Sequence, residues 1–166
     1  MSSDRLATFE GSVPGPVHRT AADGFEATLL DVIEPPTVGV PLPFDGVSLE
    51  AMSVETNPGP AAIERAQTGV TPANFAVADY GSVSLAADGT PLEVVSLYTS
   101  RHVAVVAASD VEEGMVGGYD RLADEVATGR DTQVFSTGPS STADMGGLIQ
   151  GVHGPSDTHV LVLEDR

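Results

Sequence analysis

The chain has 166 residues, of which 41% are apolar, and this is enough for one domain with a hydrophobic core. It has no cysteine, which excludes disulfides, a thiolate nucleophile and a Cys-ligated zinc or iron–sulfur centre on this chain. The 24 acidic residues far outnumber the seven basic ones, which are all Arg, and the net charge of −17 disfavours nucleic acid and anionic membranes as partners.

The acidic residues are scattered through apolar segments and form no long run, so they do not indicate a disordered tail. We expect the acid excess to reflect the salt-rich cytosol of a halophilic organism, such as a haloarchaeon, where ions screen the repulsion. No apolar run approaches the roughly 20 residues of a membrane-spanning helix, and the first residues lack the pattern of a signal peptide. We therefore expect a cytoplasmic protein.

The N-terminal part, residues 1–24, combines Gly and Pro residues with little hydrophobic periodicity. This predicts a poorly structured arm, followed by a single domain over residues 25–166. Within that domain the composition predicts short strands over 25–33, 37–42 and 46–52.

A short helix is expected over 61–68, where Pro60 suits the first helical position and Gly69 the end of the helix. Two β-prone runs, 83–85 and 93–97, flank Asp88 and Gly89, a dipeptide favoured in hairpin turns. The sequence thus predicts a β-hairpin in this region.

Residues 102–108 form a continuous apolar run, which is typical of a strand covered on both faces in a parallel sheet. Asp110 and Glu113 fit a capping box that would begin a helix ending near Gly129. A last apolar strand is predicted over 158–163. Together with the segment described next, these elements suggest a βαβαβ unit, so we predict an α/β fold with a mixed, largely parallel sheet and flanking helices.

The most informative stretch joins a predicted strand over 133–135 to a cluster of hydroxyl residues after Gly138. Ser141 and Asp144 have capping-box spacing, which predicts a short helix after the turn. The free backbone N–H groups at such a helix start suit a small carboxylate or a phosphate. From spacing alone, an ordinary strand-to-helix turn with capping side chains explains the pattern equally well.

The same stretch, STGPSSTADMGGLIQGVHGP over residues 136–155, resembles the C-terminal signature of the LUD-domain family, to which LutC-like lactate-utilisation proteins belong. In that family a Gly-Pro-Ser-x-Thr-Ala-Asp block precedes a Gly-Val-His-Gly-Pro block. A second family pattern is matched in part by 69–71 and 78–82, where Asp79 replaces Glu and Tyr80 replaces Thr. Inside the signature, Ser141 and Gly146 stand where the family often has Arg and Glu.

The resemblance implies a NagB/RpiA/CoA-transferase-like fold, with ligands at the carboxyl ends of the strands. It also implies a LutC-like subunit of a system that oxidises L-lactate to pyruvate, with iron–sulfur clusters on partner subunits and a small anion bound at the turn over 138–144. Two alternatives stay open: a stand-alone enzyme acting on a phosphorylated or CoA-linked metabolite, and a non-catalytic assembly subunit.

The candidate site residues follow from the resemblance and from the local pattern. We expect Asp144 to orient His153 across the short helix, while His102 is equally well explained as a structural residue. The candidate catalytic residues are Asp144, His153, Asp79 and His102. The candidate ligand-binding residues are Thr137, Gly138, Ser140, Ser141, Thr142, Gly154, Gly81 and Ser82. The sequence contains no metal-binding motif, and His18 and His159 have no informative context.

Overall fold

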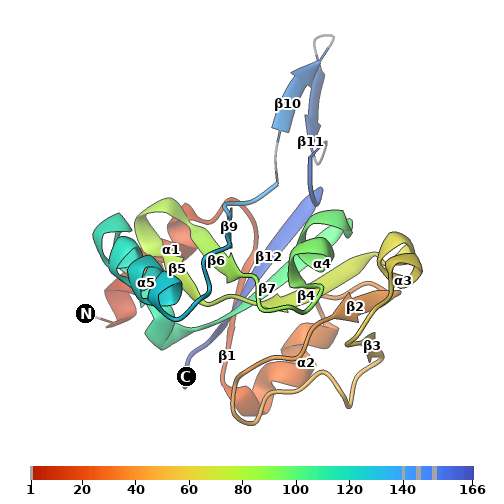
Figure 1. Cartoon of the computed structure of the whole chain (residues 1–166), viewed down its shortest axis with the longest axis horizontal. Coiled ribbons are helices and arrows are strands. Elements are labelled where there is room, and N and C mark those ends of the chain that lie inside the picture. The colour runs from red at the N-terminus through yellow and green to blue at the C-terminus, as the bar shows by residue number, and fades with distance from the viewer. Residues whose placement is uncertain (1, 140, 145–146, 151–152) are drawn as a thin grey trace.

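A computed structural model describes residues 2–139, 141–144, 147–150 and 153–166 of the chain. Its centre is a six-stranded sheet in the order β1-β12-β7-β4-β2-β3, in which every neighbouring pair runs parallel (Figure 1). The strands are β1 (Val17–Thr20), β2 (Thr37–Gly39), β3 (Val54–Glu55), β4 (Thr68–Pro72), β7 (Arg101–Ala107) and β12 (Asp157–Leu163). This confirms the predicted α/β fold with a largely parallel sheet.

The two longest strands of the sheet, β7 and β12, lie side by side in it. They pair over seven residues, from Arg101 opposite Asp157 to Ala107 opposite Leu163. Alternate residues of β7 belong to the two hydrophobic clusters on opposite faces of the sheet, with Val103 in one and Ala104 in the other. Because both faces are covered, nearly every position must be apolar, and this explains the continuous runs in the sequence.

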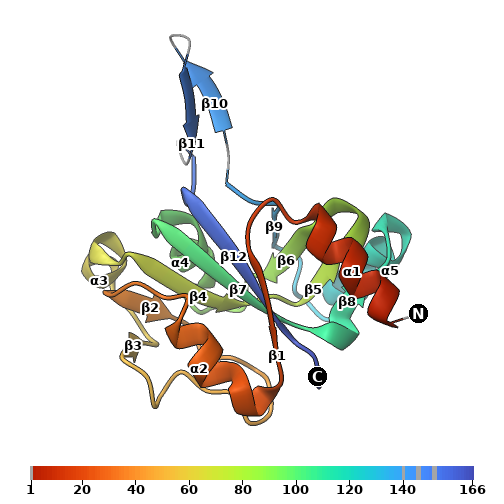
Figure 2. The same ribbon diagram turned by 180° about the vertical axis from the view of Figure 1, so that it is seen from behind.

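Helices cover both faces of this sheet (Figure 2). α2 (Phe25–Leu30) buries Phe25 and Leu29 on one face. On the other face lie α1 (Ser2–Ser12), α3 (Pro60–Arg65) and α4 (Leu92–Tyr98), whose buried apolar residues share a cluster with a second sheet. Three short 3-10 turns connect these elements: η1 (Ala22–Gly24), η2 (Ala78–Tyr80) and η3 (Ala108–Asp110).

The second sheet has the strand order β8-β5-β6-β9 and packs with α5 (Met115–Ala127). Its strands are β8 (Val111–Glu112), β5 (Phe75–Val77), β6 (Ser82–Ala86) and β9 (Gln133–Ser136). Gly118 lets α5 approach this sheet closely, since a Cβ at Gly118 would lie 3.0 Å from Val77 Cγ2. The glycine therefore contributes to packing, although in a free helix it would be unfavourable.

A two-stranded antiparallel hairpin, β10 (Ser141–Asp144) with β11 (Gly147–Gln150), projects from the body between β9 and β12 (Figure 1). The two strands pair with each other and with no other strand described in the structure. Within the described ranges, no helix combines the length and the apolar character needed to cross a bilayer.

The prediction that residues 1–24 form a poorly structured arm is wrong. α1 buries Leu6 and Phe9 against η2 and β8, and β1 pairs along the edge of the main sheet with β12. These contacts are to residues far along the chain. Because tertiary burial rather than local propensity stabilises this short helix, the local sequence pattern did not reveal it.

Four predicted elements differ from the structure. Residues 25–33 contain a helix and not a strand, and 93–97 lie in α4 and not in a hairpin, because Leu92 and Val95 are buried one helical turn apart. The predicted strand over 46–52 is a series of turns and bends. The helix expected from Asp110 begins at Met115.

The predicted βαβαβ unit is also wrong. β7 and β12 do pair in parallel, but β9 belongs to the second sheet, where it is antiparallel to β6. The helix expected after Ser141 is absent, and the segment forms β10. Its pattern of hydroxyl residues is compatible with an extended backbone as well as with a helix cap.

Candidate functional site

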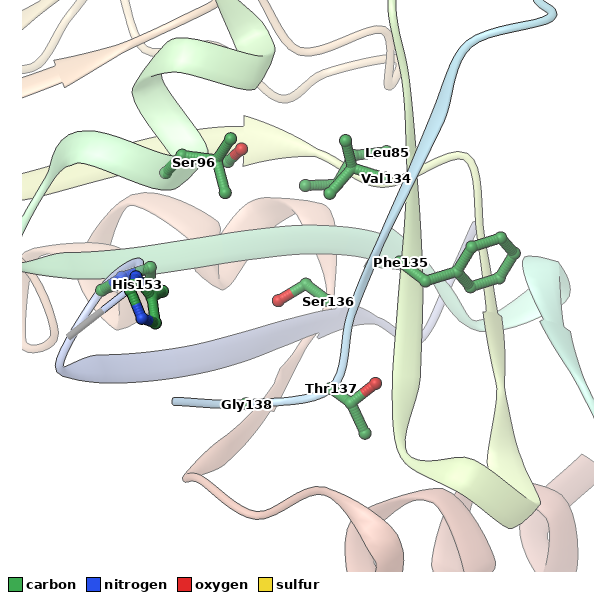
Figure 3. A pocket seen from close by; sticks show the side chains of 10 residues that line it. Leu85, Ser96, Val134, Phe135, Ser136, Thr137, Gly138 and His153 are labelled. Atoms are coloured by element: carbon green, nitrogen blue, oxygen red, sulfur yellow. The ribbon is translucent and has the colours of Figure 1, made fainter. Parts of the chain in front are cut away.

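A cavity of about 130 Å³ lies where the second sheet, α4 and the loop before β12 meet (Figure 3). Three candidate residues from the signature, Thr137, Gly138 and His153, line it together. The full lining is Leu85, Ser96, Leu97, Val134, Phe135, Ser136, Thr137, Gly138, His153 and Pro155. The structure thus brings Thr137 and Gly138, at the start of the signature, together with His153 and Pro155 of its second block, at the carboxyl end of β9 and the amino end of β12.

The turn after β9 forms one wall of the cavity. Gly138 has a φ of 114°, and a Cβ there would lie 2.9 Å from Cγ of Pro14, so both the backbone and the neighbouring proline require glycine. The preceding Thr137 hydroxyl lies 2.7 Å from the Ser82 hydroxyl of β6. Ser82 therefore holds the Thr137 side chain by a hydrogen bond, which gives this candidate residue a positioning role.

His153 also lines the cavity and is exposed on the loop that enters β12. Gly154 has a φ of 133°, and the backbone N–H groups of Ser156 and Asp157 both donate to the Ser100 carbonyl, at 3.0 and 3.2 Å. These hydrogen bonds fix the loop before β12 next to Ser100, the residue that precedes β7. In Figure 3 the Ser136 hydroxyl points towards the side of the cavity where His153 lies.

The cavity differs in charge from the rest of this acidic chain. None of the described residues that line it is acidic, and His153 is the one titratable side chain among them. A second hollow, of about 560 Å³, is lined by Asp79, Glu112 and Glu113 and would repel an anion. Of these two sites, the cavity lined by Thr137, Gly138 and His153, which we call the signature cavity, is the one that suits a small anion.

Asp79 lies apart from the signature cavity. Its side chain is exposed beside the N-terminus of α5, and Oδ2 would lie 2.9 Å from a Cβ on Gly114, the N-cap residue of that helix. A carboxylate at this position complements the helix dipole. The adjacent Gly81, with a φ of 59°, packs against the Ser12 backbone and holds α1 in place. The geometry indicates structural roles for both residues.

His102 is buried in β7, where its Nε2 lies 2.9 Å from the Thr71 hydroxyl of β4. Burial lowers the pKa of the imidazole from 6.5 to about 4. His102 is therefore neutral at physiological pH and bonded within the core. Of the two explanations that the sequence left open, this geometry favours a structural histidine.

The remaining candidates lie on or next to the projecting hairpin. Ser141, Thr142 and Asp144 are in β10, and Asp144 pairs with Gly147 at the outer end. The helix across which Asp144 was expected to orient His153 is absent. Ser140 and the side chains of residues 140–152 lie outside the described part of the structure.

Two hydroxyl residues of the cavity, Ser96 and Ser136, were missed by the sequence analysis. Ser136 directly precedes the signature block, so its position in the chain was a usable signal. Ser96 is in α4, which was predicted as a strand. In the described ranges, no three His, Cys, Asp or Glu side chains are grouped so that they could hold a metal ion.

His18 and His159 form part of a polar chain across the amino ends of three strands. His159 Nε2 lies 3.2 Å from Asp157 Oδ2, and His159 Nδ1 lies 2.9 Å from His18 Nε2. Arg101 donates to Asp157 at 2.6 Å. If His159 donates to the carboxylate, its Nδ1 accepts from His18 Nε2, and these hydrogen bonds fix the tautomer of each ring.

The pKa values in this polar chain are also shifted. Burial, and then the neighbouring His159, lower the pKa of His18. Burial raises the pKa of the Asp157 carboxyl, but the Arg101 hydrogen bond and His159 outweigh it, so the net pKa is lowered. The folded state therefore favours the deprotonated form of both groups.

Acid should begin to destabilise the protein below about pH 6.5, where the carboxylates are still ionised. His102 and His18 have lowered pKa values in the folded state, so their stabilising contribution is complete above pH 6.5 and is lost as the pH falls through the folded value. For His102, with a folded pKa of about 4, the loss amounts to about 3 kcal/mol. Urea unfolding between pH 7.5 and about 4, at constant salt, measures it. Unchanged stability over this range would contradict the buried, neutral state of these histidines.

The family model described as the LUD domain matches residues 60–163, which is most of the chain and includes the cavity. This chain belongs to the LUD-domain family. The match begins at α3 and ends with β12. The elements before α3 in this LUD-domain protein, including α1, β1, α2, β2 and β3, therefore lie outside the matched range.

Several curated relatives of this LUD-domain protein are named lactate utilization protein C. The protein of Bacillus subtilis is 30% identical over 107 residues, covering 62% of this chain and 45% of the relative. That of Halalkalibacterium halodurans is 32% identical over 107 residues, covering 62% and 46%. The chain thus spans less than half the length of these relatives.

A solved structure, described as a DUF162 family protein from Deinococcus radiodurans, has the same fold. It superposes with a TM-score of 0.77 over 99% of both chains, at 19% sequence identity. At this identity the likeness concerns the fold alone. Since it covers nearly the whole chain, it includes the N-terminal helix and strand that the sequence analysis missed.

Proposed function

We propose that this LUD-domain protein is a LutC-like component of a lactate-utilisation system and binds a small hydroxy carboxylate, such as L-lactate, in the signature cavity. The observation that carries the proposal is the meeting of Thr137, Gly138 and His153 around one cavity without acidic side chains. The curated relatives named lactate utilization protein C support lactate as the ligand.

The size of the cavity favours a small ligand. Its volume is about 130 Å³. Pockets for drug-sized ligands are larger, at about 300–1,000 Å³. A three-carbon acid therefore suits the cavity better than a CoA-linked metabolite does.

The lining residues offer the groups that a hydroxy acid requires. The hydroxyls of Ser136 and Thr137 can donate to a carboxylate, and the imidazole of His153 can accept the proton of the substrate hydroxyl. Oxidation of lactate to pyruvate releases two electrons and two protons. His153 would take the hydroxyl proton, while the two electrons and the second proton pass to an acceptor outside this chain.

The redox acceptor belongs to other subunits in this proposal. A conventional iron–sulfur cluster is held by cysteine thiolates. The chain has no cysteine, so its side chains do not supply these ligands. We infer that iron–sulfur subunits are its partners. An isolated protein that oxidises lactate or turns over a phosphorylated metabolite would instead support the stand-alone enzyme.

Replacing His153 with Gln should abolish the lactate-dependent activity of the system reconstituted with its iron–sulfur subunits, because Gln cannot take up the hydroxyl proton. The rate should fall by about 100-fold or more, which is typical for loss of a general base. L-lactate binding, measured by calorimetry on the isolated chain, should weaken less than the rate.

The same substitution at His18, which does not line the cavity, is the matched control and should retain activity at pH 7.5. Full activity of the His153→Gln variant would leave only an assembly role for this chain. Loss of activity in both variants would point to a general effect on folding, which circular dichroism would reveal.

A further inference from the structure

The projecting hairpin of β10 and β11 has an unusual position for a two-stranded element. It lies outside both sheets and points away from the body in both views (Figures 1 and 2). An isolated two-stranded hairpin is marginally stable in water, and most such elements need a third strand or a packed layer. The position of the hairpin therefore suggests that it packs against another molecule.

The sequence of the hairpin is poor in charge. Residues 141–150 contain one charged residue, Asp144, although the chain as a whole has 24 acidic and seven basic residues among 166. Ala143, Leu148 and Ile149 are apolar. A surface segment with this composition is typical of one that is buried in an interface.

A matching apolar surface lies on α4. Val94, Leu97 and Tyr98, with helical spacing along one side of α4, are 43%, 42% and 74% exposed. We call these three residues the α4 face. Next to it, a groove of about 510 Å³ between α3 and α4 is lined by Pro58, Pro60, Ile63, Glu64, Pro91, Val94 and Tyr98. The α4 face also reaches the signature cavity, because Leu97 lines it.

We propose that the hairpin of one copy packs on the α4 face of a second copy, and that the exchange is reciprocal in a two-fold dimer. Both surfaces belong to the same chain, so a two-fold axis buries two hairpins and two α4 faces at once. The dimensions agree: a four-residue strand spans about 13 Å, and the seven residues of α4 span about 10 Å.

Charge also favours this place for self-association. Two chains that each carry a net charge of −17 repel one another over most of their surfaces. The α4 face has no charged residue, and the hairpin has one, so contact here brings few like charges together. Contact between two copies at an acidic surface, such as the hollow at Asp79, would bring like charges together and be unfavourable.

The dimer would also explain why the family signature is divided in the structure. Within one chain, Thr137, Gly138 and His153 line the cavity, whereas Ser141, Thr142 and Asp144 are carried away on the hairpin. In the dimer, the hairpin of the second copy would lie beside the cavity, next to Leu97. This consequence rests on the proposed function, but the dimer itself does not.

Disulfide cross-linking tests the exchange directly, because the chain has no cysteine of its own. Val94→Cys is introduced in a tagged chain and Leu148→Cys in an untagged chain, and the two are mixed and oxidised. We expect a disulfide-linked heterodimer, since a disulfide forms where Cα atoms come within about 7 Å. Val116→Cys, at a side chain on α5 that is 81% exposed, replaces Val94→Cys as the control and should form no cross-link with Leu148→Cys.

Light scattering provides a second measurement that needs no cysteine. The unmodified chain should be a dimer, Leu97→Asp should be a monomer, and Val126→Asp, at a similarly exposed position on α5, should remain a dimer. A monomeric unmodified chain would overturn the proposal. So would equal cross-linking by Val94→Cys and Val116→Cys. Neither readout involves lactate, so a failure here leaves the proposed function intact, and a failed lactate experiment leaves the dimer intact.

Discussion

Truncating Phe9 to alanine should lower the free energy of unfolding by about 3–5 kcal/mol, as is usual for a buried phenylalanine. Phe9 is 0% exposed and packs in the cluster that joins α1 to the second sheet. Its loss would leave a cavity between α1 and the strands, which the short helix could fill only by moving. Urea unfolding of the full chain at constant salt measures the effect.

The matched control is Tyr119→Ala, which truncates an aromatic side chain that is 64% exposed on α5 and should change stability much less. If Phe9→Ala and Tyr119→Ala have equally small effects, α1 does not pack as the structure shows. That result would agree with the sequence-based prediction that residues 1–24 form a poorly structured arm.

Replacing Gly138 with valine should remove the response of the protein to L-lactate. A side chain at a φ of 114° strains the backbone, and its Cβ would meet Pro14 at 2.9 Å, so the turn that forms one wall of the cavity must move. The strain should also cost about 1–3 kcal/mol of stability. The measurement is the rise in melting temperature with added lactate.

Gly129→Val is the control, because Gly129 also has a positive φ, of 90°, but no atom lies within 4 Å of its Cβ position. It should lose stability through backbone strain and keep the lactate response. Equal lactate responses in the two variants would show that the turn at Gly138 does not take part in binding.

The central strands of the fold could be predicted from the sequence because their signal is local. A strand buried on both faces, such as β7, needs an apolar residue at almost every position. α1 and α4 could not be predicted in this way. Their buried residues, such as Phe9 and Val95, face partners far along the chain, and short helices depend on such tertiary contacts more than on propensity.

For the site, three residues named from the signature, Thr137, Gly138 and His153, line one cavity in the structure. It could not show that Ser96 joins them, because α4 reaches the cavity only through tertiary packing. The pairing of His18 with His159, which are 141 positions apart, depends on β1 lying beside β12 and has no local signal. Asp79 matched a family pattern, but its place beside α5 follows from the packing of the second sheet.

The central claim, that the signature cavity binds a small hydroxy carboxylate at His153, is tested most directly by NMR of the histidine side chains during a titration with L-lactate. The four histidines of the chain give few signals, and substitution of each one assigns them. We expect the imidazole signals of His153 to shift and saturate with added lactate, while those of His102, which is buried in the core, stay unchanged. Unchanged His153 signals at saturating lactate would contradict this claim.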